Sequence, residues 1–132
     1  MVKLNISNID VSERLSDLYA PLTLEQRKLL NENYTLQSLK KNEMIYCEGD
    51  NPEQLFCLLS GKVKIYKDGV GGRSQIIRMI KSSGYFGYRA HFAHEGYVAA
   101  AAAFGPSVMC SFPIKIIDQL IGRSRYERAA AN

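Results

Sequence analysis

From Tyr34 onward, clusters of turn-forming residues divide the chain into short apolar or alternating runs. The dividers are "KKNE", "EGDNP", "SG", "KDGVGG", "SSG" and "GP". The runs between them occupy residues 34–39, 44–47, 55–59, 63–66, 75–80, 98–104 and 108–112. Short runs that recur roughly every ten residues between glycine-rich turns are typical of strands in a β-sandwich or β-barrel. The sequence therefore predicts a mainly β fold.

Helices are expected on both sides of this β region. In "LTLEQRKLLNEN", Thr23 is a suitable N-cap, and Gln26 three residues later completes a capping box. An earlier helix is expected over residues 12–20, ended by Pro21. We expect an N-terminal helical segment at residues 1–33, a β-barrel at 34–112 and a C-terminal helix at 113–132.

The last of these helices is predicted from "PIKIIDQLIG". Pro113 suits the first position of a helix. Ile114, Ile117 and Leu120 recur at helical spacing and predict one buried face, and Gly122 is expected to end the helix. The five consecutive alanines at 99–103 lie between Val98 and Phe104, so they predict a strand packed close to another backbone rather than a linker.

The chain has 132 residues, which suits one domain with its own core. Its net charge of +4 is unevenly distributed. Residues 1–50 carry 6 basic and 8 acidic side chains, whereas residues 51–132 carry 11 and 5. The basic second half fits an anionic ligand or weak attraction to nucleic acid, and it equally fits a solvated surface.

Two features indicate the compartment. The longest apolar stretch, residues 98–104, is too short to span a bilayer, and residues 1–15 lack the apolar core of a signal peptide. Cys47, Cys57 and Cys110 are odd in number and widely spaced, which disfavours a disulfide framework or a zinc ribbon. We therefore expect a cytoplasmic protein without membrane contact, whose cysteines are buried free thiols.

His91 and His94 form an H-x-x-H pair that could share a helical face and hold a metal ion. No third ligand is evident, and neither a nucleophile motif nor a Walker loop occurs. We expect these histidines in a short helical turn after Gly87, with no metal site, no certain cofactor and no catalysis. A small cupin-type metalloenzyme is the weaker competing class, which metal analysis would test.

Three local motifs occur in order along most of the chain. They are "YCEGDNPEQLFCLLSGKVKIY" at residues 46–66, "SGYFGYRAHFA" at 83–93 and "SVMCSFPIKIIDQLI" at 107–121. Together they resemble the cyclic-nucleotide-binding domain of the Crp/Fnr transcription regulators. The resemblance implies a mainly β fold with flanking helices, namely the double-stranded β-helix or jelly-roll barrel of that domain, over roughly residues 22–121.

The family's phosphate cassette is altered in this sequence. The family pattern is a Gly-Glu-Leu segment followed about ten residues later by Arg-Ser/Thr-Ala, where the arginine pairs with phosphate and the glutamate binds the ribose. Aligned on Gly87, Tyr88 stands in the glutamate position, Arg89 in the leucine position and Tyr97 in the arginine position. Val98 replaces the Ser/Thr, and Ala99 matches the alanine. The resemblance thus makes cyclic AMP a conceivable ligand, but the missing glutamate and arginine disfavour it.

Two interpretations of this cassette remain open. In one, Arg89 replaces the lost arginine and the tyrosines supply hydroxyls and ring faces, so that the pocket takes another anion or a flat ligand. The expected ligand-binding residues are then Gly87, Tyr88, Arg89, Ala90, Tyr97, Val98 and Ala99. In the other, Arg89 points to solvent or joins a subunit contact, the tyrosines fill the pocket, and the domain only dimerises or docks on a partner.

In the family, a dimer helix and a DNA-binding helix-turn-helix follow the barrel. The resemblance leaves two alternatives, a free-standing domain or the effector domain of a longer regulator, and we favour the second, in which residues 113–132 lead into a truncated dimer helix. Such a regulator is expected to be dimeric at full length and to contact DNA only through a C-terminal domain outside this sequence. A ligand would act allosterically by shifting the helix after Pro113.

Overall fold

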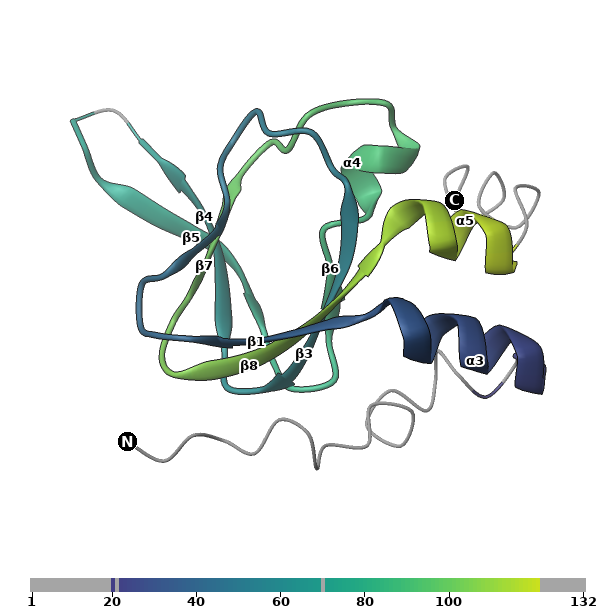
Figure 1. The fold of residues 1–132 in the computed structure, drawn as a ribbon. Helices are drawn as coiled ribbons and strands as arrows, with labels where there is room; N and C mark the ends of the chain where they lie inside the picture. Colours follow the sequence, from purple (N-terminus) through teal and green to yellow (C-terminus); the bar gives the residue numbers. More distant parts are fainter. Residues whose placement is uncertain (1–19, 21, 70, 122–132) are drawn as a thin grey trace.

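Two four-stranded sheets, packed face to face, make up most of the computed structural model, which describes residue 20, residues 22–69 and residues 71–121. One sheet has the strand order β1-β8-β3-β6 and the other β2-β7-β4-β5, with antiparallel pairing throughout (Figure 1). The strands are β1 (Thr35–Leu39), β2 (Met44–Tyr46), β3 (Gln54–Ser60), β4 (Val63–Asp68), β5 (Ser74–Ile80), β6 (Tyr85–Phe86), β7 (Ala100–Ala103) and β8 (Ser107–Pro113). This confirms the predicted mainly β, jelly-roll type of fold with flanking helices.

The core lies between the sheets and continues beneath the helices. Its centre contains Phe56, Leu58, Val63 and Met109, each less than a tenth exposed. The runs of the sequence therefore correspond to strands because their apolar side chains meet across the sandwich. The hairpin of β4 and β5 projects from one side of the molecule (Figure 1).

The alanine run forms the inner strand β7, between β2 and β4. Ala101, Ala102 and Ala103 are at most 1% exposed. The strand is shorter than predicted, because Val98 and Ala99 precede it in an irregular segment. That irregular segment forms part of the candidate site.

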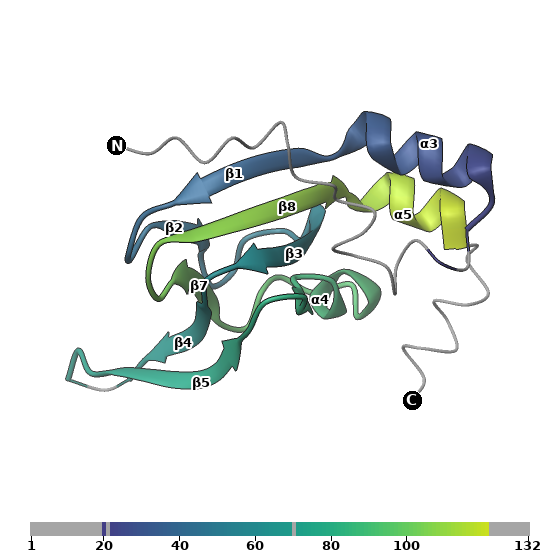
Figure 2. The ribbon, with the colours of Figure 1, turned by 90° about the horizontal axis from the view of Figure 1, so that it is seen from below.

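Helices α3 (Leu24–Asn33) and α5 (Ile114–Ile121) lie side by side at one end of the sandwich (Figure 2). The predicted capping box at Thr23 and Gln26 is confirmed in both directions. The Gln26 side-chain amide also donates to the carbonyl oxygen of Leu120 at 3.3 Å, so the cap of α3 is tied to the end of α5. Ile117 and Leu120 are buried on the face of α5 that packs on the barrel.

Some expected features of the helices and strands differ from the structure or concern residues that it does not describe. Pro113 is not the first helical residue, because β8 continues through it and α5 begins at Ile114. Strand β6 was not predicted. The expected helix at residues 12–20 and the stop at Gly122 lie essentially outside the described residues.

The expectation of three buried thiols is wrong for Cys47, which is exposed just after β2. Cys57 and Cys110 are buried and face each other in the β3–β8 register. Within residues 22–69 and 71–121, no three histidine, cysteine, aspartate or glutamate side chains are grouped as metal ligands. The helices in the same described part of the chain are each too short or too polar to cross a bilayer.

Candidate functional site

Gly87 shapes the backbone at the centre of the site. Its φ of +84° lies in the left-handed region that favours glycine. A Cβ atom here would lie 2.5 Å from Cδ2 of Phe56 and 3.2 Å from the hydroxyl of Tyr97. Gly87 therefore lets the turn between β6 and α4 (Arg89–Phe92) lie directly against the aromatic core.

Tyr97 closes the site from within. Its side chain is 7% exposed, and its hydroxyl donates to the carbonyl oxygen of Gly87 at 2.9 Å. Its ring stacks on Tyr46, with centroids 3.6 Å apart and planes 10° from parallel. Tyr46 in turn contacts Phe56 and Phe86, so the base of the site is an aromatic cluster.

Both tyrosines are protonated at neutral pH. Burial raises the pKa of Tyr46 to about 12, although Arg78 acts in the opposite direction. Burial, followed by the charges of Tyr46, Asp50 and Glu53, raises the pKa of Tyr97 above its usual value. A protonated Tyr97 hydroxyl is the form that donates to Gly87.

The loop after β2 holds Tyr97 in place. Gly49 donates its amide to the Tyr97 carbonyl at 2.7 Å, and the Tyr97 amide donates to the Asp50 carbonyl at 3.0 Å. A Cβ atom on Gly96 would lie 2.8 Å from the Gly49 carbonyl oxygen, so these two segments approach as closely as glycine allows. Backbone contacts thus fix the tyrosine that stands at the family's arginine position.

A hollow of about 300 Å³ opens on one side of the Tyr46–Tyr97 stack. All seven residues expected from the cassette line it: Gly87, Tyr88, Arg89, Ala90, Tyr97, Val98 and Ala99. Tyr46, Ile65, Ile77, Arg78 and Phe86 complete the lining and were missed. Arg78 and Arg89 are its charged side chains, and the remainder is mostly aromatic or aliphatic. The geometry therefore suits a small anion with an apolar body.

The two open interpretations of Arg89 and the tyrosines each describe part of this geometry. Arg89 is exposed, yet it lines the hollow. Tyr97 fills the inner part, while Tyr88 is half-buried in the lining. Tyr97 therefore fills the inner part of the site, and an open hollow remains beside it.

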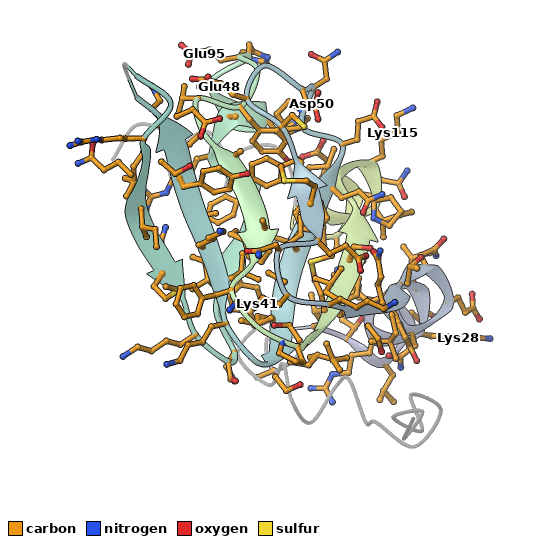
Figure 3. All side chains as sticks on the ribbon, turned by 90° about the vertical axis from the view of Figure 1, so that its left-hand side faces the viewer. Lys28, Lys41, Glu48, Asp50, Glu95 and Lys115 are labelled. Carbon is orange, nitrogen blue, oxygen red and sulfur yellow. The ribbon has the colours of Figure 1, made fainter. Side chains whose placement is uncertain are left out.

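A second hollow, also of about 300 Å³, lies against the same tyrosine pair and has the opposite charge. Asp50 and Glu53 are its charged lining residues. Figure 3 shows Glu48, Asp50 and Glu95 gathered at this end of the sandwich. An anionic ligand would therefore favour the hollow that contains the arginines.

Helix α4 joins the site to the C-terminal helix. His91 Nε2 lies 3.3 Å from a carboxylate oxygen of Asp118 on α5. His94 lies beyond α4, with a φ of +56°, so the two histidines do not share one helical face. The histidine pair considered as metal ligands instead places His91 at a contact between two helices.

Known proteins that are similar to this chain include a family of domains and a solved sensor domain. The family model described as "Cyclic nucleotide-binding domain" matches residues 36–124. The solved sensor domain of the transcriptional regulator DNR from Pseudomonas aeruginosa is similar, with a TM-score of 0.75 and 27% identity, covering 89% of this chain and 81% of that one.

Two curated relatives show how widely this domain occurs. The regulatory protein HlyX of Actinobacillus pleuropneumoniae is 27% identical over 114 residues, covering 83% of this chain and 46% of HlyX. A cGMP-dependent protein kinase of Toxoplasma gondii is 30% identical over 105 residues, covering 80% of this chain and 10% of the kinase. The chain thus spans about half of the regulator and a tenth of the kinase.

Proposed function

The chain belongs to the cyclic nucleotide-binding domain family, and from this membership we propose that it is the ligand-sensing domain of a Crp/Fnr-like transcription regulator whose pocket no longer selects cyclic nucleotides. Its similarity to the DNR sensor domain and to HlyX supports the regulator class. The observation that carries the proposal is the hydrogen bond from Tyr97 to Gly87 at the base of an otherwise open hollow.

Loss of cyclic-nucleotide binding follows from the chemistry of the lining. A charge-assisted hydrogen bond from arginine to phosphate contributes roughly 1.5–3 kcal/mol, which corresponds to about 10- to 150-fold in affinity. Tyr97 cannot supply that charge, and its hydroxyl is already used by the Gly87 carbonyl. Tyr88 likewise cannot replace a carboxylate that accepts from ribose hydroxyls.

The proposed output is a movement of α5. A ligand that displaces residues 87–90 would move α4, and the contact between His91 and Asp118 supports transfer of that movement to α5. In the full-length regulator, α5 would lead toward the dimer helix and DNA-binding domain that the family resemblance implies. DNA binding and dimerisation at full length are part of this proposal.

Restoring the cassette tests the proposal. We expect the wild-type chain to show no calorimetric response to millimolar cyclic AMP or cyclic GMP. The triple variant Tyr88→Glu, Tyr97→Arg, Val98→Ser should gain binding, because it restores the carboxylate, the guanidinium and the hydroxyl. The matched control carries Tyr97→Gln in place of Tyr97→Arg, together with Tyr88→Glu and Val98→Ser. It should show no calorimetric response to either nucleotide. Micromolar binding by the wild type would contradict the proposal.

One observation favours the alternative of an interaction module. Ile76 and Ile77 are 47% and 57% exposed on β5, an edge strand, and an exposed apolar edge can pair with another chain. Light scattering tests whether the chain self-associates through this strand. A tight oligomer that dissociates in Ile76→Lys would favour the module, and a monomer at high concentration would exclude self-association through this strand.

A further inference from the structure

Strand β5 carries a β-bulge beside the hollow. Ile65 of β4 pairs with Arg78, but the next residue, Tyr66, pairs with Ile76, so Ile77 is an extra residue without a partner. A bulge reorients neighbouring side chains and is frequent beside functional sites. Here it allows the consecutive residues Ile77 and Arg78 both to line the hollow, although successive side chains of a regular strand point to opposite faces.

Arg78 is an exposed residue of β5 that lines the hollow. It is two positions before Ile80, which is 2% exposed in the core, so both lie on the same face of β5. Its cross-strand partner Ile65 packs against the same core. The Arg78 side chain is nevertheless exposed, so its charge is hydrated at the rim of the hollow and stays accessible to a ligand. The charge of Arg78 already acts on Tyr46, at the base of the hollow.

No carboxylate pairs with Arg78 among the described residues. Their ion pairs join Lys28 to Glu32, Lys67 to Glu48 and His91 to Asp118, and include neither Arg78 nor Arg89. The lining of the hollow contains no acidic residue. The two guanidiniums, one from β5 and one from α4, therefore border the same apolar space, and the described chain supplies no anion for either.

We propose that Arg78 and Arg89 together bind the acidic group of a small ligand whose flat apolar body rests on the aromatic wall. The ligand class is an aromatic or otherwise planar carboxylate, phosphate or sulfonate. Guanidinium suits all three groups because it offers a planar fork of donors. This inference rests on the proposed function, since it specifies what the sensing hollow recognises.

A pair of fluorescent probes tests this assignment in the 132-residue chain. 8-Anilinonaphthalene-1-sulfonate carries the acidic group, and N-phenyl-1-naphthylamine has the same rings without it. Arg78→Gln and Arg89→Gln should each weaken the sulfonate by roughly 3- to 10-fold, as loss of one partly exposed charge-assisted contact predicts. The neutral probe should bind all variants within about twofold, because it makes no such contact.

Arg73→Gln is the matched control. It removes the same charge from the same hairpin, just before β5, but Arg73 does not line the hollow. Its sulfonate affinity should equal that of the wild type. If Arg73→Gln weakens the sulfonate as much as Arg78→Gln does, the effect is one of net charge and the assignment is wrong.

Backbone amide shifts separate failure of this inference from failure of the proposed function. Binding in the hollow should shift the amide signals of Gly87, Ala90, Tyr97 and Ala99. If millimolar sulfonate moves none of them, the hollow is not a ligand site and both proposals fall. If they move while both arginine variants bind like the wild type, only the two-arginine assignment is overturned.

Discussion

Replacing Gly87 by alanine tests the central turn of the site. An L-residue at a φ of +84° costs roughly 1–2 kcal/mol relative to glycine. The added Cβ would also lie 2.5 Å from the Phe56 ring, a contact that requires repacking at about 1–3 kcal/mol. We therefore expect Gly87→Ala to lower the free energy of unfolding by roughly 2–5 kcal/mol.

Gly71→Ala is the matched control, because Gly71 has a φ of +81° but nothing within 4 Å of its Cβ position. It should cost only the backbone part, roughly 1–2 kcal/mol. Urea unfolding followed by far-ultraviolet circular dichroism measures both, with tyrosine fluorescence as a second probe because the chain contains no tryptophan. Equal destabilisation by the two variants would refute the packing argument. Phe56→Leu in the Gly87→Ala background should recover part of the difference.

Three further predictions concern stability and thiol access. Burial raises the pKa of Tyr46 to about 12 from 10.0, so its contribution to stability is complete below pH 10 and is lost as the pH rises toward 12. The urea midpoint should therefore fall over this pH range, and Tyr46→Phe should make the fall smaller. A wild-type midpoint that stays constant from pH 9 to about 11.5 would contradict this prediction. Thr23→Ala removes a capping box and should cost about 1 kcal/mol by urea unfolding, so an unchanged midpoint would show that the cap is redundant. Cys47 should react with a thiol reagent in the native protein, whereas Cys57 and Cys110, whose pKa values are raised chiefly by burial, should react only after unfolding; fast labelling of all three would refute the buried assignment.

The strands and helix caps were predictable because they depend on local patterns. The alternating run at Val63 and the capping box at Thr23 identify their elements within a few residues. Strand β6 has only two residues, Tyr85–Phe86, so no alternation can reveal it. Whether Pro113 ends a strand or begins a helix depends on pairing with Gln54 across the sheet, which no local pattern encodes.

The site residues that belong to the cassette could be predicted from their spacing along the chain. The residue that strand pairing brings to the hollow could not. Gly87 and Tyr97 follow from the spacing of the cassette, and the structure brings them together. Arg78 lies 9 residues before Gly87 in a run that reads as an ordinary strand. Only the bulge opposite Ile65 shows that it lines the hollow. The exposed position of Cys47 likewise follows from where β2 ends, not from its residue type.

The tyrosine at the family's arginine position changes where a ligand's charge can be held. Tyr97 stacks on Tyr46, and its hydroxyl donates to the Gly87 carbonyl oxygen. At the base of the hollow, this hydroxyl is therefore already bonded within the protein. A ligand at the base contacts ring faces but meets no charge there, and the charges that line the hollow are those of Arg78 and Arg89, both exposed. Arg89 begins the helix that contacts α5, so an anion bound to it would act on the element joined to the C-terminal helix rather than on the barrel core.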